Sequence, residues 1–254
     1  MGISLKNFDR VLALAGNPNT GKSSVFNALT GLKQHTGNWP GKTVTRAEGG
    51  LVYAGVRYKL VDLPGTYSLL SASQDEEVAR NFILFGRPDC TIVVVDATAL
   101  ERNLNLVLQV LEVTDRVVVA VNLMDEAQRK GITVDVRSLA RELGVPAVPT
   151  VARTGEGLHD LVRTAAEVVE GKISIAARKA PAPPEVQRAV DELLPLIEQV
   201  APGLPNARWV AYRLLDGDYR VRQALLTGEL ALLSAAQSAS PEAASRKMAV
   251  AGRQ

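Results

Sequence analysis

Residues 16–24 read Gly16-Asn17-Pro18-Asn19-Thr20-Gly21-Lys22-Ser23-Ser24, and this stretch decides the fold. It follows the apolar run VLALA at residues 11–15 and precedes the amphipathic segment VFNAL at residues 25–29. The spacing GxxxxGKS between a strand and a helix is typical of a phosphate-binding loop, because its glycines let backbone N–H groups turn toward phosphate oxygens at a helix N-terminus. Lys22 is expected to reach the β- and γ-phosphates, and the Ser23 hydroxyl to ligate Mg²⁺.

A second motif follows the strand-like residues 56–61 and reads Asp62-Leu63-Pro64-Gly65. DxxG alone is a weak signal. Because a strand precedes it and a phosphate loop lies upstream, we interpret it as the second half of a nucleoside triphosphate site. Asp62 can hold a water in the Mg²⁺ shell, and the Gly65 N–H can meet the γ-phosphate.

A third motif, Asn122-Leu123-Met124-Asp125, follows the apolar residues 117–121 and is a variant of the guanine-specificity pattern NxxD. The Asp125 carboxylate is suited to accept hydrogen bonds from the ring N1–H and the 2-amino group of guanine, which adenine does not offer in that pattern. An acceptor left unpaired by the wrong base costs roughly 1–3 kcal/mol. We therefore expect GTP rather than ATP, with Asn122 tying loops together rather than touching the base.

Apolar and amphipathic segments alternate along the first two thirds of the chain. Strands are expected at residues 11–15, 91–96, 117–121 and 145–151, with a hairpin of residues 51–54 and 56–61 and a mobile connection over 31–50. Helices are expected at residues 102–114, 136–143 and 157–169. This alternation predicts an α/β fold: a doubly wound, mostly parallel sheet flanked by helices, with ligands at the carboxyl ends of the strands.

The composition changes at residues 171–184, where GKISIAARKAPAPP combines small residues, cations and prolines. Beyond it the spacing of apolar residues is helical, Pro195 is expected to kink or interrupt the first helix, and residues 209–215 and 219–226 are expected to be helical. We predict a nucleotide-binding domain over 1–171, a linker over 172–184 and a small all-α subdomain with a tail over 185–254.

Composition narrows the function classes. The 254 residues carry 29 basic and 27 acidic side chains, a net charge of +2 that gives no support to nucleic-acid binding. The single cysteine, Cys90, excludes an internal disulfide, and two separated histidines argue against a zinc site. The acidic run at residues 75–77 is interpreted as a helix start rather than a metal site. No stretch reaches the roughly 18 apolar residues of a membrane span, so the chain is expected to be soluble.

The motifs GNPNTGKSSVFNALTG, GNWPGKTV at residues 37–44, DLPGTYSL and NLMD, in this order, closely resemble the cytoplasmic N-terminal GTPase domain of the FeoB family of bacterial ferrous iron transport proteins. The resemblance covers residues 1–170, and the helical segment resembles the family's GDP-dissociation-inhibitor-like domain. It implies a Ras-like P-loop GTPase on the cytoplasmic face of the inner membrane, using GTP or GDP, Mg²⁺ and K⁺. Its partners would be the membrane segments of the same full-length protein.

The resemblance also implies roles for single residues. Thr43 corresponds to the switch threonine whose hydroxyl joins Mg²⁺ when GTP is bound, beside Ser23 and Asp62. Asn19 matches an asparagine that helps ligate K⁺ in potassium-activated GTPases, with the backbone around residues 37–41 completing the shell; the alternative is a turn-forming residue. That ion would stand where other GTPases use an arginine finger.

Together these expectations define a site. The catalytic residues are Lys22, Asn19, Thr43 and Gly65. The nucleotide-binding residues are Gly16, Asn17, Pro18, Asn19, Thr20, Gly21, Lys22, Ser23, Ser24, Asp62, Gly65, Asn122, Asp125 and Ala152.

Two departures from the usual GTPase pattern carry consequences. Thr66 follows DxxG where Ras-like enzymes have a water-orienting glutamine, so intrinsic hydrolysis should be slow; the neighbouring Tyr67 is interpreted as packing and given no catalytic role. Val151 and Ala152 replace the usual Ser-Ala of the base-backing loop. The Ala152 N–H is then the expected contact to the guanine O6, and weak GDP retention with fast exchange follows.

Two other interpretations stay open. A stand-alone GTPase of ribosome assembly or tRNA modification shares the phosphate loop, but should carry a basic surface. A nucleotide sensor without turnover would not need Lys22, Ser23, Thr43 and Asp62 together. The oligomeric state, including a homo-oligomer, is left open by the sequence.

Overall fold

The computed structural model describes residues 8–31, 34–39, 43–69, 73–179 and 182–232. They divide into two compact units. The sheet unit lies within Met1–Ile83 and Pro88–Lys179, and the helical unit within Leu84–Arg87 and Ala180–Gln254. Each unit is described by itself.

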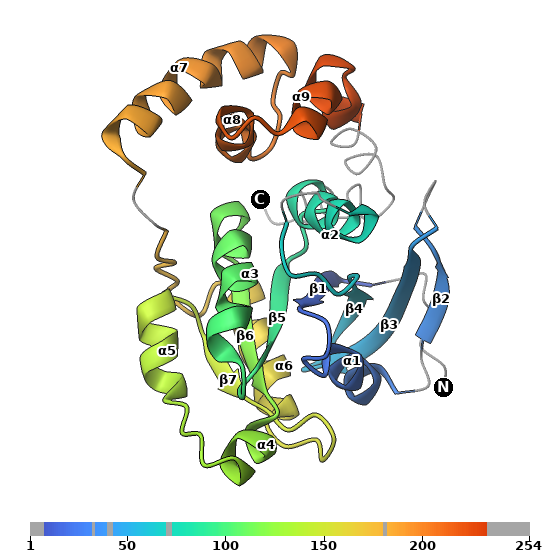
Figure 1. Ribbon diagram of the computed structural model, residues 1–254. Helices are drawn as coiled ribbons and strands as arrows, with labels where there is room; N and C mark the ends of the chain where they lie inside the picture. Colours follow the sequence, from blue (N-terminus) through green and yellow to red (C-terminus); the bar gives the residue numbers. More distant parts are fainter. Residues whose placement is uncertain (1–7, 32–33, 40–42, 70–72, 180–181, 233–254) are drawn as a thin grey trace. The chain divides into compact units, whose positions relative to one another are not determined.

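The sheet unit is built on seven strands in the order β2-β3-β4-β1-β5-β6-β7 (Figure 1). Five of them, β4, β1, β5, β6 and β7, run parallel, while β3 is antiparallel to β4 and β2 to β3. The strands are β1 (Arg10–Gly16), β2 (Gln34–Asn38), β3 (Thr45–Tyr53), β4 (Val56–Asp62), β5 (Cys90–Asp96), β6 (Val117–Asn122) and β7 (Ala147–Pro149). The doubly wound, mostly parallel sheet predicted from the sequence is confirmed.

Helices cover both faces because the central strands are apolar on both. All but the last residue of β5, CTIVVVD, and all of β6, VVVAVN, are buried, as expected for parallel strands at the centre of a sheet. On one face α1 (Lys22–Thr30) and α6 (Leu158–Val169) pack on a single cluster with Leu14, Ile92 and Val118. Helix α3 (Leu100–Val113) packs against β5 and β6. The remaining helices are α2 (Gln74–Phe85), α4 (Met124–Arg129) and α5 (Val136–Leu143).

One expectation for this unit was wrong. Residues 31–50 were expected to form a mobile connection, but β2 and the first half of β3 lie there as an antiparallel pair in which Gly37 faces Arg46 and Asn38 faces Thr45. The strand β2 reads QHTGN and its described side chains are exposed at the sheet edge, so it has no apolar alternation to reveal it. The hairpin predicted across Gly55 is present, with β3 and β4 paired from Tyr53 and Val56 outward.

The residues after α6 stay with the sheet unit as far as Lys179. Ile173 and Ile175 pack against the core cluster under α1 and α6. The Ala176 N–H donates to the Gly144 carbonyl at 3.0 Å, and the Arg178 N–H to the Leu143 carbonyl at 3.0 Å, so this segment lies along the C-terminal end of α5. We refer to residues 172–179 as the strap.

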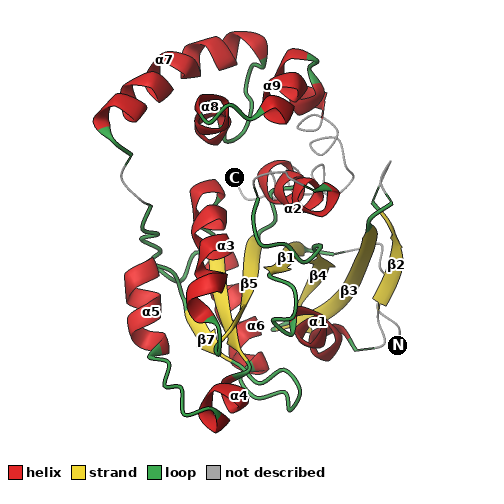
Figure 2. Cartoon of the chain, in the orientation of Figure 1, coloured by secondary structure: helices red, strands yellow, loops and turns green. Residues whose placement is uncertain are grey.

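The helical unit contains α7 (Pro184–Val200), α8 (Ala207–Leu215) and α9 (Tyr219–Leu226), drawn as helices in Figure 2. Pro195 was expected to kink or interrupt the first helix; it does not interrupt it, because α7 continues through Pro195 to Val200. Pro195 lies on an exposed position of the helix, where water can bind the carbonyl group that its missing N–H leaves unpaired. Within the described residues, no helix combines the length and apolarity needed to cross a membrane.

Candidate functional site

The carboxyl ends of the parallel strands gather the polar motifs. Strand β1 ends at Gly16, β4 at Asp62 and β6 at Asn122, and because these strands are parallel their ends meet at one edge of the sheet. The phosphate loop follows β1 and leads into α1 at Lys22. The chain therefore places three sequence motifs side by side.

The phosphate loop is shaped by Gly21. Its φ of +80° lies in the left-handed region, and a Cβ built on it would lie 2.3 Å from the Asn122 amide nitrogen. Glycine is thus needed both for the turn and for the close approach of a second loop. Inside the loop the Thr20 hydroxyl donates to the Asn17 carbonyl at 2.9 Å.

The side chains of the loop divide into buried and exposed. Asn17 is 2% exposed, and within the described residues both polar atoms of its side chain lack a hydrogen-bond partner. Pro18, Asn19, Ser23 and Ser24 are exposed. Asn19 has a φ of +66°, a left-handed conformation that asparagine tolerates better than most residues. This conformation fits a turn-forming Asn19 and equally leaves its side-chain oxygen available to a ligand.

Lys22 crosses to the end of β4. Its Nζ lies 2.5 Å from Oδ1 of Asp62, and both side chains are largely buried. Burial raises the pKa of the Asp62 carboxyl group, and the nearby Lys22 ammonium opposes that rise. A phosphate group would compete with Asp62 for Lys22, and a cation would compete with Lys22 for Asp62.

The segment after Asp62 packs on the phosphate loop. A Cβ on Gly65 would lie 3.6 Å from the Cα of Pro18, and the Thr66 N–H donates to the Gly16 carbonyl at 3.2 Å. Further along, the Leu69 N–H donates to the Gln109 side-chain oxygen at 2.7 Å. The Arg102 guanidinium lies 4.4 Å from the centroid of the Tyr67 ring, so Tyr67 packs on α3, in agreement with its interpretation as a packing residue.

Asn122 joins three segments at the base-reading end. It is fully buried, its amide nitrogen donates to the Thr20 carbonyl at 2.9 Å, and its oxygen accepts from the Thr150 hydroxyl at 3.3 Å. The same oxygen accepts from the Ala152 N–H at 3.0 Å. The N–H expected to face the guanine O6 is therefore bonded to Asn122 in this structure.

Asp125 lies in the first turn of α4, which begins after Leu123 in a left-handed conformation with φ +63°. Its Oδ2 lies 3.3 Å from an Nη atom of Arg153, in the loop after β7, and 3.5 Å from an Nη atom of Arg129. The carboxylate side chain is 28% exposed. Asp125 can therefore meet a ligand from solvent while arginines from two elements hold one of its oxygens.

Thr43 forms no hydrogen bond with the phosphate loop or with Asp62 in the described part of the chain. Its hydroxyl donates to the Gln74 side-chain oxygen at 3.3 Å, at the start of α2, rather than to Lys22, Ser23 or Asp62. The backbone expected to complete a K⁺ shell, residues 37–41, lies partly outside the described residues.

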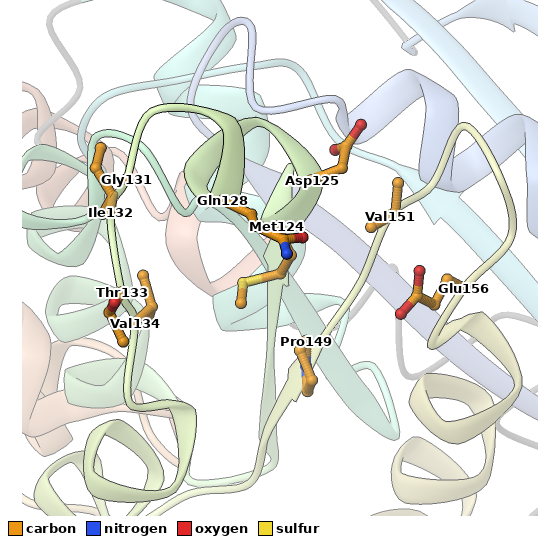
Figure 3. Close-up of a pocket in the computed structure, with 10 residues that line it drawn as sticks. All are labelled: Met124, Asp125, Gln128, Gly131, Ile132, Thr133, Val134, Pro149, Val151 and Glu156. Atoms are coloured by element: carbon orange, nitrogen blue, oxygen red, sulfur yellow. The ribbon is translucent and has the colours of Figure 1, made fainter.

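A pocket of about 460 Å³ lies beside the base-reading loops (Figure 3). Met124 and Gln128 lie near its centre, and Asp125 and Val151 at its upper edge in that view. The other lining residues are Gly131, Ile132, Thr133, Val134, Pro149 and Glu156. Met124 and Asp125 of the NxxD motif and Val151 and Glu156 of the loop after β7 line this pocket, while the phosphate loop takes no part in it.

Sequence reasoning missed three contributors: Thr150, Arg153 and Gln109. Thr150 and Arg153 lie in the loop after β7, where the sequence places the base-backing loop at residues 150–154 without giving either residue a role. The signal available in the sequence was Val151: because it has no hydroxyl to offer Asp125, another residue of this loop had to be considered as the partner of Asp125. Gln109 belongs to a helix expected on periodicity alone, so nothing pointed to its bond with Leu69.

The donor set fits a hard cation. The Ser23 hydroxyl and the Asp62 carboxylate are oxygen ligands of the kind that Mg²⁺ prefers, at the phosphate loop and at the end of β4. The buried, unpartnered amide of Asn17 supports a ligand-facing loop. Among the described residues there is no group of three or more His, Cys, Asp or Glu side chains that could hold a metal.

Comparison with known proteins agrees with this geometry. Residues 10–165 match the family model described as ferrous iron transport protein B, and residues 183–248 match that of the FeoB cytosolic helical domain. An Fe(2+) transporter FeoB of Shigella flexneri is 39% identical over 217 residues, which cover 82% of this chain and 27% of that protein. The chain thus spans about a quarter of its curated relative.

Solved structures agree as well. The cytosolic domain of T. maritima FeoB in a GDP form is 34% identical, with a TM-score of 0.77 and coverage of 91% of this chain and 93% of that one. The cytosolic domain of L. pneumophila FeoB is 33% identical, with a TM-score of 0.76 and coverage of 90% and 87%. The chain therefore belongs to the FeoB family of ferrous iron transport proteins.

Proposed function

We propose that the chain is the GTP-binding and GTP-hydrolysing regulatory part of a bacterial ferrous iron transporter. The observation that carries this is the meeting of three motifs: Lys22 reaches Asp62, and Asn122 binds both Thr20 and Ala152. The relatives support the nucleotide, since the T. maritima structure is a GDP form, and the cargo, since the Shigella flexneri protein is an Fe(2+) transporter.

The residues take the following roles in this proposal. Backbone N–H groups of the phosphate loop bind phosphate oxygens at the N-terminus of α1, with Lys22 on the β- and γ-phosphates. Ser23 and Thr43 ligate Mg²⁺, and Asp62 holds a water of its shell. Asp125 accepts from the guanine N1–H and 2-amino group, while Gly65 donates its N–H to the γ-phosphate. Contacts of the γ-phosphate with Gly65 and of Mg²⁺ with Thr43 switch residues 31–50 and 66–73, and hydrolysis releases those contacts.

Asp62→Asn tests the Mg²⁺ role. We expect the gain in affinity for a non-hydrolysable GTP analogue on adding Mg²⁺ to fall about tenfold, because a charged acceptor for the metal-bound water becomes neutral. The Mg²⁺-free affinity should not fall, because the variant no longer competes with phosphate for Lys22 through an ion pair. Titrations with excess Mg²⁺ and with a chelator measure both. An unchanged response to Mg²⁺ would remove Asp62 from the metal shell.

Potassium is the second ion in this proposal. Asn19 is exposed at the turn of the phosphate loop, where its side-chain oxygen can reach an ion beside the α- and γ-phosphates. The ion offsets the negative charge that develops as the γ-phosphate leaves, the task of an arginine finger in other GTPases. Without K⁺, hydrolysis is slow because Thr66 cannot orient the attacking water as glutamine does.

Steady-state GTP hydrolysis in KCl and NaCl of equal ionic strength tests both the activity and the ion. We expect K⁺ to raise the rate at least about tenfold, and Asn19→Ala to abolish that stimulation without abolishing GDP binding. The exposed Gln223, on α9, gives a control amide in which Gln223→Ala keeps the stimulation. Equal rates in both salts would leave Asn19 as a turn residue, and no hydrolysis in either salt would contradict the enzymatic function.

The remaining features of the proposal concern the full-length protein. The chain acts at the cytoplasmic face of the inner membrane, joined to transport segments beyond its C-terminal residues, and binds no nucleic acid. Residues 1–171 carry the nucleotide-binding motifs, residues 172–184, which include the strap, form the connection, and residues 185–254 form a GDI-like subdomain that adjusts nucleotide affinity. A homo-oligomer is compatible with this arrangement.

A further inference from the structure

The Asp125 carboxylate is held by a side chain from the opposite loop. Its Oδ2 accepts a hydrogen bond from Arg153 at 3.3 Å, and the two residues come from α4 and from the loop after β7. Arg129 approaches the same oxygen at 3.5 Å, but it lies one turn further along α4 and also faces Glu126. Of these two arginines, Arg153 is the one that reaches the Asp125 carboxylate from the loop after β7.

The neighbouring residue explains why such a bridge is needed. Val151, which stands where the base-backing loop usually has serine, has no side-chain hydroxyl to donate to a carboxylate. The Ala152 N–H is bonded to Asn122. The loop after β7 therefore reaches Asp125 through the guanidinium group of Arg153.

A two-point contact depends on the orientation of the carboxylate. Guanine presents two donors to Asp125, the N1–H and the 2-amino group, so both carboxylate oxygens must lie in the plane of the base edge. A guanidinium bonded to one lone pair of Oδ2 restrains rotation of the carboxylate, while the second lone pair of Oδ2 and the whole of Oδ1 stay available to the two donors of the base. Hypoxanthine lacks the 2-amino group and needs only one oxygen, so the restraint matters less to it.

We propose that Arg153 is a positioning residue for base recognition: from the loop after β7, it orients the Asp125 carboxylate toward the guanine 2-amino group. The proposal rests on the guanine-binding function proposed above and adds a residue that sets its specificity. It also gives the loop a means of retaining GDP in place of the Ser-Ala pattern, which Val151 and Ala152 replace in this chain.

Arg153→Ala tests this through the ratio of two affinities. The Arg153 side chain is 77% exposed, so the variant should fold, which a thermal melt checks. We expect the GDP dissociation constant to rise about three- to fivefold, as for loss of an exposed ion pair, and that of inosine diphosphate to rise less than about twofold. The preference for GDP over inosine diphosphate then falls. Titration with a fluorescent GDP, and competition by the inosine nucleotide, measure both constants.

Two further variants separate orientation from charge. Arg153→Lys keeps a single donor within reach of Oδ2 and should recover at least half of the lost preference. Arg129→Ala removes a cation from the same oxygen without cutting the bridge, and should change the preference less than Arg153→Ala. An equal loss for both nucleotides in Arg153→Ala, or an equal effect of Arg129→Ala, would overturn the proposal. A wild-type chain that binds neither guanine nor inosine nucleotides would instead contradict the proposed function itself.

Discussion

Asp125→Asn is expected to transfer the nucleotide preference of this chain from GDP to xanthosine diphosphate. The aspartate offers two acceptors to the guanine N1–H and 2-amino group, whereas an asparagine offers one acceptor and one donor. The donor meets the 2-amino group of guanine as a second donor and the 2-oxo group of xanthine as an acceptor. Because a site built for one hydrogen-bond pattern rejects the other strongly, GDP affinity should fall by about 10²–10⁴-fold and xanthosine diphosphate affinity should rise.

Equilibrium titration with both nucleotides measures this exchange. The neighbouring Glu126, also on α4, provides the control. Glu126→Gln also removes a carboxylate of α4, but Glu126 has no part in base recognition in this proposal, so the preference for GDP should remain. Loss of GDP binding with no gain for the xanthine nucleotide would show that Asp125 supports the loop rather than reads the base.

Gly21→Ala is expected to abolish nucleotide binding, with a loss of affinity of at least about a hundredfold. The added Cβ would lie 2.3 Å from the Asn122 amide nitrogen, so Asn122 must leave the Thr20 carbonyl or the phosphate loop must open. Left-handed backbone also costs an alanine about 1 kcal/mol or more. Both effects act on the loop that binds the phosphates, so affinity and thermal stability fall together.

Gly55→Ala separates the effect of backbone strain from the effect of a steric clash. Gly55 also has a φ of +80°, in the turn between β3 and β4, but a Cβ there would meet nothing within 4 Å. We expect a small loss of stability and unchanged GDP affinity, measured by thermal melting and titration. Similar losses of affinity in the two variants would mean that general destabilisation, and not the Asn122 contact, explains the effect at Gly21.

The sequence predicted the sheet and the motifs because their signals are local. Strands β5 and β6 are continuous apolar runs, and α5 ends at Gly144 in the left-handed conformation expected of a C-cap. The strand β2 escaped because QHTGN pairs through backbone bonds at an exposed edge, and such bonds leave no side-chain pattern. Pro195 does not interrupt α7, because the cost of a proline inside a helix is smaller where the carbonyl group that it leaves unpaired faces water.

The site was predictable as a set of residues and unpredictable as a set of contacts. The glycines of the phosphate loop and the NxxD spacing can be recognised because each motif is a short, continuous stretch of the chain. The bonds of Asn122 to Thr20 and of Asp125 to Arg153 join residues 102 and 28 positions apart, and only the topology of the sheet brings them together. The Lys22–Asp62 pair likewise depends on β1 lying beside β4.

The strap has a practical consequence for dividing the chain. Composition places the end of the nucleotide-binding domain at residue 171, but a fragment cut there would lose Ile173 and Ile175 from its core and the backbone bonds that end α5 at Leu143 and Gly144. A Cβ at Gly144 would lie 1.9 Å from the Ala176 carbonyl oxygen, so the two segments are closely fitted. A fragment meant to fold and crystallise by itself should therefore extend through Lys179, the last residue of the sheet unit.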